Sequence, residues 1–209
     1  KALIQVVYNG MFNATAQGIP ASSPYADPTL LPPRRDIAHA KALLKEAGVK
    51  TPYTVELTAP NQPDIAQTAE VIQAMAAEAG FDVKIRLSEF ASSLQAQVAG
   101  DYQTYLIGWS GRADPDGNVY GGYRSGGPFN SSHYVSKEMD ELLDKARAVS
   151  GVAERKALYA KVSQLAEHDL PHIYLWTTGN VMALNRKLKG FVLVPDGMVR
   201  LQGMHFAKE

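Results

Sequence analysis

The sequence predicts an α/β fold in which a mainly parallel sheet is flanked by helices. Two segments, 53–59 and 81–87, alternate apolar and polar residues as half-buried strands do, and 102–108 is expected to be a third strand. An amphipathic helical pattern separates each of these segments from the next. Strands that alternate with helices at this spacing are joined by right-handed crossovers, so we expect them to lie parallel in one sheet.

The composition is that of a globular chain and excludes some function classes. The 209 residues include 21 Lys or Arg and 21 Asp or Glu, so the formal net charge is zero and we expect no nucleic-acid partner. The chain has no Cys, which excludes disulfides, thiolate metal ligands and a cysteine nucleophile. No apolar run approaches the roughly 20 residues that a membrane span needs.

Residues 1–35 predict an entry helix followed by a proline-rich arm. Residues 1–8 have a helical apolar pattern that Gly10 ends, but no N-cap residue precedes them. This pattern indicates either a frayed terminal helix or, as the favoured interpretation, a chain that begins inside a helix of a longer protein. Five prolines between 18 and 33 predict an extended arm, because proline disrupts helix interiors and cannot donate to a strand ladder.

Capping residues then delimit three helices. The expected N-cap or start residues and glycine stops are Asp36 and Gly48, Asp64 and Gly80, and Ser88 and Gly100. Helical spacing predicts one buried apolar face for each helix. These faces are Ile37, Ala40, Leu43, Leu44 and Ala47; Ile65, Ala69, Ile72, Met75, Ala76 and Ala79; and Phe90, Leu94 and Val98.

The second half of the chain predicts a long loop, two helices and further strands. Segment 108–134 holds seven of the 17 Gly and several aromatic residues, and it follows the carboxyl end of a strand, where open α/β sheets place ligand sites. Ser136 predicts the N-cap of one helix, and Pro171 ends the next. Further strands are expected at 172–177, at 181–184 and from Leu188, with a turn at 195–198.

The candidate binding residues lie in the loop 109–118: Trp109, Arg112, Asp114, Asp116 and Asn118. The Arg112 guanidinium can bind a carboxylate through two hydrogen bonds, although a solvated loop arginine fits the sequence equally well. The acidic spacing is compatible with calcium, but no acidic residue follows at the position that an EF-hand requires. A turn held by Asp and Asn side chains is therefore the favoured interpretation of Asp114, Asp116 and Asn118.

Elsewhere the sequence contains no recognised catalytic or metal motif. The five His are scattered, and Pro171 interrupts the helix face that His168 and His172 would share. No phosphate-binding glycine loop and no G-x-S-x-G nucleophile turn is present. We therefore expect no catalytic residue, no metal and no cofactor.

Several segments together resemble one known family. They are AKALLKEAG at 40–48, GWSGRADPD at 108–116, RKALY at 155–159, Leu170-Pro171, and GFVLVPDG at 190–197. Each segment is weak evidence alone, but their order and spacing are similar to those of the extracytoplasmic solute-binding proteins of dipeptide/oligopeptide ABC importers, the family 5 group. The likeness covers nearly the whole chain and corresponds to the C-terminal lobe of those longer proteins.

The resemblance implies a periplasmic-binding-protein-like lobe of a two-lobed clamp. Such a clamp closes on a peptide-like solute and passes it to an ABC permease in the membrane. The implied parts are an entry helix and arm at 1–35, a ligand-binding lobe at 36–187, and a tail at 188–209 that returns to an N-terminal lobe outside this chain. The implied location is periplasmic or otherwise extracytoplasmic, with lipid anchoring in a Gram-positive host.

The resemblance also assigns roles within the loop 109–118. It implies that Trp109 packs against the ligand. Many peptide-binding members have an Asp a few residues after this Trp, and that Asp pairs with the free amine of the ligand. In this sequence Arg112 stands close to that position. Either Asp114 binds the amine instead, or the site has the reverse polarity and prefers a carboxylate.

Three functions remain open from the sequence. The favoured one is a non-enzymatic transport binding protein. The second is an α/β hydrolase-type enzyme that uses Asp114 or Asp116, although no acid–base pair has a spacing that indicates catalysis. The third is a structural or interaction domain. Saturable stabilisation by peptides without turnover would distinguish the first from the other two.

Overall fold

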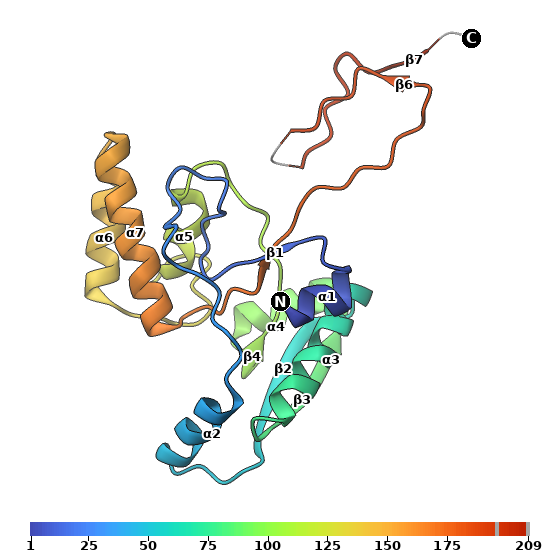
Figure 1. Ribbon diagram of the computed structural model, residues 1–209. Helices are drawn as coiled ribbons and strands as arrows, with labels where there is room; N and C mark the ends of the chain where they lie inside the picture. Colours follow the sequence, from blue (N-terminus) through green and yellow to red (C-terminus); the bar gives the residue numbers. More distant parts are fainter. Residues whose placement is uncertain (195–196, 208–209) are drawn as a thin grey trace.

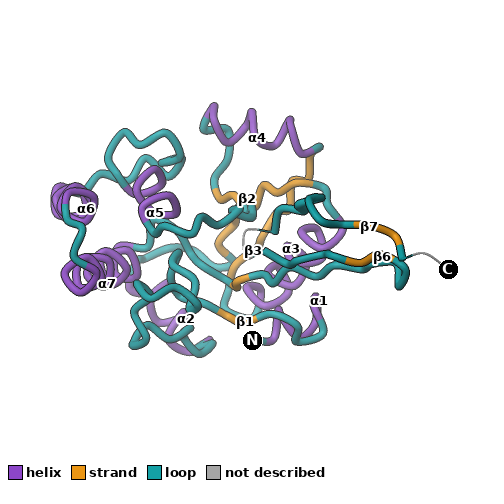
Figure 2. The backbone as a smooth tube through the Cα atoms, turned by 90° about the horizontal axis from the view of Figure 1, so that it is seen from above, coloured by secondary structure: helices purple, strands orange, loops and turns teal. Residues whose placement is uncertain are grey.

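The computed structural model describes residues 1–194 and 197–207. It has the predicted α/β architecture, and its elements form three groups: a sheet with its helices, a set of three helices, and a C-terminal hairpin that projects from the rest (Figure 1). Figure 2 shows the three helices α5 (Asp116–Tyr123), α6 (Lys137–Ala148) and α7 (Val152–Asp169) on one side of the sheet and the hairpin on the opposite side.

Three parallel strands form the central sheet: β2 (Tyr53–Pro60), β3 (Phe81–Ser88) and β4 (Thr104–Tyr105). The strand order is β3-β2-β4, which confirms the predicted parallel sheet. β2 and β3 pair over their whole lengths, but β4 is shorter than the expected strand 102–108 because only two of its residues pair with β2. In β2 the last four residues are all buried, so the expected alternation of burial is not observed there.

One face of the sheet carries the main apolar core of this group. α3 (Pro63–Ala77) packs on β2 and β3, and α1 (Ala2–Tyr8) packs on α3. The buried residues between α3 and the sheet are Leu57, Ala59, Ile65, Ala69, Val83 and Leu106. The predicted helix from Asp64 is thus confirmed. Pro63 lies in its first turn, where a backbone N–H has no partner within the helix, so proline breaks no hydrogen bond there.

The helix α2 (Ile37–Glu46) confirms its predicted cap. The Asp36 carboxylate accepts a hydrogen bond from the backbone N–H of His39 at 2.8 Å. Gly48 follows the helix with a φ of +66°, the left-handed conformation expected of a glycine stop. The predicted apolar face is only partly buried: Leu44 is buried, whereas Leu43 is 50% exposed.

The predictions for α4 (Phe90–Ala99) need two corrections. The N-cap is Glu89 and not Ser88, because the Glu89 carboxylate accepts from the backbone N–H of Ser92 at 3.1 Å. The expected apolar face is also wrong, since Val98 is 87% exposed. Ser93 is the fully buried residue instead; its hydroxyl is satisfied by the Phe90 carbonyl, so a polar side chain can face the sheet without penalty.

Three helices pack together beside the sheet: α5 (Asp116–Tyr123), α6 (Lys137–Ala148) and α7 (Val152–Asp169). The N-cap Ser136 and the end of α7 before Pro171 are as predicted. α5 was not predicted, because its sequence is glycine-rich and lies inside the segment expected to be a loop. The buried core of these helices contains Ile19, Val119, Tyr123, Met139, Leu143, Ala146, Tyr159, Val162 and Ala166.

The proline-rich arm forms no helix or strand, and it packs against α7. Ile19 is fully buried in the core of the three helices. The buried carboxylate of Asp27 accepts a hydrogen bond from the Gln164 side chain at 2.7 Å and another from the Thr29 hydroxyl at 2.7 Å. These hydrogen bonds hold the pKa of Asp27 below its usual range. The arm is therefore an integral part of the helical core.

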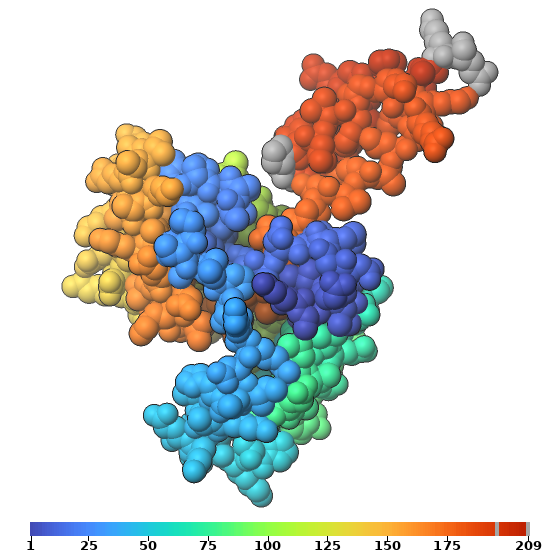
Figure 3. All heavy atoms as spheres, viewed as in Figure 1, coloured from blue at the N-terminus to red at the C-terminus, as the bar shows by residue number. Residues whose placement is uncertain are grey.

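Short antiparallel pairs complete the structure. β1 (Asn13–Ala14) pairs with β5 (Trp176–Thr177), which is shorter than the expected strand 172–177. The strand expected at 181–184 is wrong: this segment pairs with no strand of the described chain. β6 (Leu188–Lys189) and β7 (His205–Phe206) form the hairpin that projects from the molecule in Figure 3. Pro195 and Asp196, from the expected turn, lie outside the described residues.

Candidate functional site

The loop 109–118 leaves the sheet just after β4, at the edge where the parallel strands end. Trp109 is 48% exposed, and the edge of its ring system packs against Phe129 at a centroid distance of 5.2 Å. The guanidinium carbon of Arg112 lies 5.3 Å from the centre of the Trp109 ring. A half-exposed aromatic ring with a guanidinium over it therefore lies at the position where open α/β sheets bind ligands.

Asn118, in the first turn of α5, holds this loop in place. Its side-chain oxygen accepts from the Trp109 indole N–H at 3.3 Å and from the Arg112 backbone N–H at 2.6 Å. Its amide nitrogen donates to the backbone carbonyls of Arg112 at 2.8 Å and Asp114 at 3.3 Å. These four hydrogen bonds use the full capacity of the side-chain amide.

The Arg112 side chain folds back over its own loop. Its guanidinium donates to the carbonyl of Ser110 and to the Ser110 hydroxyl, the latter at 3.0 Å. Its aliphatic stem lies against Gly117, where a Cβ atom would come within 2.9 Å of the Arg112 Cγ. The groups that accept hydrogen bonds from the Arg112 guanidinium are thus all neutral groups of an exposed loop.

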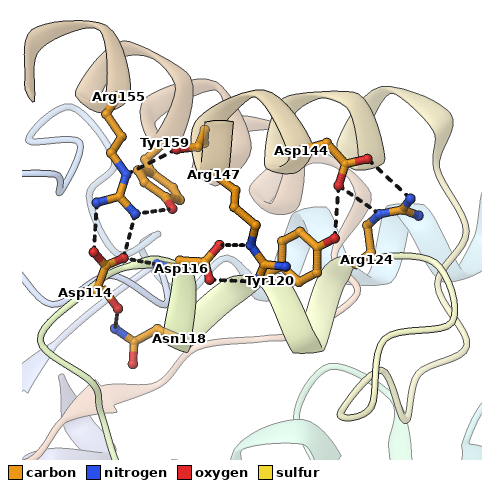
Figure 4. Close-up of polar contacts among 10 residues, drawn as sticks. Asp114, Asp116, Asn118, Tyr120, Arg124, Asp144, Arg147, Arg155 and Tyr159 are labelled. Carbon is orange, nitrogen blue, oxygen red and sulfur yellow. Dashed lines mark hydrogen bonds and ion pairs between the residues drawn. The ribbon is translucent and has the colours of Figure 1, made fainter. Parts of the chain in front are cut away.

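The two loop carboxylates are ion-paired with α6 and α7 (Figure 4). Both oxygens of Asp114 accept from the Arg155 guanidinium, at 2.7 and 2.8 Å. Both oxygens of Asp116 accept from Arg147, at 2.7 and 3.0 Å. The hydrogen bonds that Arg155 donates hold the pKa of Asp114 below its usual range, and those that Arg147 donates to Asp116 raise the pKa of Arg147.

A third ion pair continues the same row between α5 and α6. Arg124 contacts Asp140 at 2.8 Å and Asp144 at 3.2 Å, and the Tyr120 hydroxyl donates to Asp144 at 3.0 Å. Figure 4 shows the contacts of Asp144 with Arg124 and Tyr120 lined up along the helices with the two loop pairs. The loop and α5 are therefore attached to α6 and α7 by three successive arginine–carboxylate pairs.

The structure brings all five candidate residues together, Trp109, Arg112 and Asp114 in the loop and Asp116 and Asn118 in the first turn of α5, but their surroundings differ. Trp109 and Arg112 are exposed, whereas Asp114, Asp116 and Asn118 are engaged by protein groups. The sequence did not predict Arg147 and Arg155 as partners of the loop carboxylates, because a single sequence does not reveal contacts between residues 31 and 41 positions apart. The only available signal was the RKALY segment, which was used for resemblance and not for charge pairing.

The remaining titratable groups offer no metal site among the described residues, where no group of three or more His, Asp and Glu gathers. His168 is exposed and contacts Asp169 at 2.8 Å. His172 lies beside the rings of Tyr123 and Tyr174, and its burial lowers its pKa.

An α/β lobe with an aromatic and charged loop at the end of a parallel sheet is typical of solute-binding proteins. The comparison with family models agrees: residues 1–131 match the model described as bacterial extracellular solute-binding proteins, family 5 middle. The chain belongs to this family. In the part of the chain that the structure describes, no helix is long and apolar enough to cross a membrane.

Individual relatives support the same assignment. The chain is 30% identical over 206 residues to the dipeptide-binding protein of Escherichia coli, covering 94% of this chain and 38% of that protein. It is 32% identical over 192 residues to the di/tripeptide-binding protein 4 of Pseudomonas aeruginosa, covering 84% and 36%. A periplasmic binding protein of Helicobacter pylori, solved with the peptide STSA, superposes with a TM-score of 0.83 at 26% identity over 99% of this chain and 41% of that one. The chain thus spans less than half the length of these relatives.

Proposed function

We propose that the protein acts as the solute-binding component of an ABC importer and binds a peptide or peptide-like solute at the loop 109–118. The main support for this proposal is the exposed pair of Trp109 and Arg112 at the end of the parallel sheet. The relatives named above support the peptide class, since two are called dipeptide- or di/tripeptide-binding proteins and one was solved with a peptide.

We further propose that a second lobe covers this loop and that the segment 188–209 reaches toward it. The described part of the hairpin supports this arrangement, because Val192, Leu201 and Phe206 are each more than two-thirds exposed. Apolar surface of this extent is typical of an interface. In this proposal the segments 1–35 and 36–187 form the lobe that carries the loop, and the clamp works outside the cytoplasm with a membrane permease as its partner.

The proposed function is binding without catalysis. The hydrolase alternative required a free loop carboxylate as catalyst, and no relative named here supports it. Asp114 and Asp116 are each paired with an arginine through both oxygens, which leaves neither well placed to accept a proton from a substrate.

Thermal denaturation with a random mixture of tripeptides tests this proposal. We expect saturable stabilisation of the chain and no loss of peptide over hours, because a ligand that binds only the folded state raises its stability. Trp109→Ala should remove most of the stabilisation. Tyr53→Ala, which changes a 38% exposed aromatic residue at the start of β2, is the matched control and should preserve it. Hydrolysis of the mixture, or an equal loss in both variants, would contradict the proposal.

A further inference from the structure

The charges of the binding loop indicate which end of a solute it recognises. Segment 109–118 contains three charged side chains: Arg112, Asp114 and Asp116. Both carboxylates are neutralised by arginines from neighbouring helices. The Arg112 guanidinium donates to Ser110 and Gly111, and among the described residues it forms no ion pair. The loop therefore presents one uncompensated positive charge and no free negative charge.

Asp114 is firmly committed to its partner. Arg155 is only 15% exposed, and it also donates to the Ala146 carbonyl at 3.1 Å and to the Tyr159 hydroxyl at 3.2 Å. If Asp114 turned toward a ligand amine, this largely buried guanidinium would lose its counter-ion. Asp114 is itself 54% exposed, but a ligand amine would still have to replace two charge-assisted hydrogen bonds from a fixed guanidinium. Asp114 is therefore unsuited to capture an amine.

Asp116 is committed in a similar way. Its carboxylate is 24% exposed and accepts from two nitrogens of Arg147. The Arg147 guanidinium in turn lies flat over the Tyr120 ring, 3.3 Å from the ring centre. The ring and the carboxylate fix the arginine from two directions, so Asp116 anchors the start of α5 to α6.

Arg112 is in the opposite situation. Its guanidinium is exposed and donates to one neutral carbonyl and one hydroxyl of Ser110. A carboxylate is a much stronger acceptor for a guanidinium than a peptide carbonyl, and it fits the fork through two parallel hydrogen bonds. The adjacent Trp109 face offers an apolar surface for the rest of the solute.

We infer that the loop recognises a carboxylate of its solute through Arg112, and that Asp114 and Asp116 position the loop and do not bind the amine of the solute. This inference rests on the proposed function and gives the site its polarity. The preferred solutes are peptides or peptide-like molecules with a free carboxylate, whether or not their amine is free.

The test uses one random tripeptide mixture in three forms: unblocked, N-acetylated and C-amidated. The chain has two Trp, so the Trp109 indole N–H signal in a ¹⁵N spectrum can be assigned with a Trp109→Phe variant and followed during titration. We expect the acetylated form to bind within about threefold of the unblocked form. We expect the amidated form to bind about tenfold to a hundredfold more weakly, because it lacks the charge-assisted hydrogen bonds.

Variants show whether Arg112 determines the preference for a carboxylate, separately from whether the loop binds a solute at all. Arg112→Met should make the acetylated and amidated forms bind equally weakly. Arg34→Met is the matched control, since Arg34 is an exposed arginine outside the loop, and it should preserve the difference. Preferential binding of the amidated form would overturn this inference while the proposed function stands. If no form shifts the Trp109 signal, the loop is not the solute site and both proposals fail.

Discussion

Asn118 shows how far a binding loop can depend on one side chain. Its amide makes four hydrogen bonds that tie the Trp109 indole and the Arg112 backbone to the first turn of α5. The sequence made Asn118 a candidate ligand contact but favoured a side chain that holds a turn. Its hydrogen bonds agree with the second role, that of a positioning residue. A residue that fixes the loop without touching the solute should change loop mobility more than overall stability.

Asn118→Ala tests this positioning role. We expect the Trp109 indole hydrogen to exchange with solvent roughly 5- to 30-fold faster, since the loss of these hydrogen bonds lowers the local opening free energy by about 1–2 kcal/mol. The global free energy of unfolding should change less, because Ala favours the helix in which residue 118 lies. Hydrogen exchange and urea denaturation measure the two quantities. Asn61→Ala, at an exposed asparagine after β2, should change neither.

The Asp114–Arg155 pair should make stability depend on pH. Arg155 lowers the pKa of Asp114 in the folded state, so the pair stabilises the fold above the unfolded-state pKa of about 3.9. This contribution is lost as the pH falls through the lowered pKa. Because Asp114 is 54% exposed, we expect Asp114→Asn to cost about 0.5–1 kcal/mol at pH 7.

Urea denaturation of Asp114→Asn and the unmodified chain between pH 7 and pH 3 measures this dependence. The difference in unfolding free energy should stay constant from pH 7 to about 5 and shrink below about pH 4, as the carboxyl is protonated first in the unfolded and then in the folded chain. A difference that stays constant down to pH 3 would mean that the residue contributes through packing and not through its charge.

At the scale of elements, the sequence predicted regular patterns well and glycine-rich segments poorly. The strands β2 and β3 and the helices α2, α3, α6 and α7 follow from periodicity and caps, which are local signals. α5 was missed because Gly117, Gly121 and Gly122 lower helix propensity. These glycines have a packing role that one sequence does not reveal: Arg112 lies against Gly117, and Phe129 lies against Gly121.

Gly117→Ala tests whether α5 needs its glycine for the loop. Ala favours helix formation by roughly 1 kcal/mol, yet its Cβ would lie 2.9 Å from the Arg112 Cγ. We expect the unfolding free energy to change by less than about 1 kcal/mol, because the two effects oppose each other. We also expect the Trp109 indole signal to shift, because Arg112 must move off its site. An unchanged signal, with unfolding free energy raised by the full helix-propensity gain, would show that the close contact is unimportant.

At the scale of the whole molecule, contacts between residues distant in sequence could not be predicted. Trp109 and Arg112 could be selected because they lie in a loop after a predicted strand. The partners of Asp114 and Asp116 could not, since they come from helices that are distant in sequence and reach the loop only after the three helices pack. The packing of the arm on α7 and the pairing of β1 with β5 were inaccessible for the same reason.

The projecting hairpin should make the chain self-associate. Its exposed apolar residues include Val192, Met198, Leu201 and Phe206. Contiguous apolar surface of this kind favours association in water. Analytical ultracentrifugation of the chain at increasing concentration should reveal dimers or larger species. The double substitution Val192→Glu and Leu201→Glu should restore a monomer without changing the melting temperature by more than about 2–4 °C. An unmodified chain that stays monomeric at every concentration would contradict this prediction.

The short pairing of β1 with β5 has a consequence for how this architecture can be rebuilt. Asn13 and Thr177 are direct partners although about 160 residues separate them, so the chain enters and leaves the intervening region at one place. A region with adjacent entry and exit can be spliced into a surface loop of a host protein, or circularly permuted, with little disturbance of either backbone. Since α1 packs on α3, a unit that carries the loop 109–118 into an unrelated scaffold should begin with α1 and end with β5.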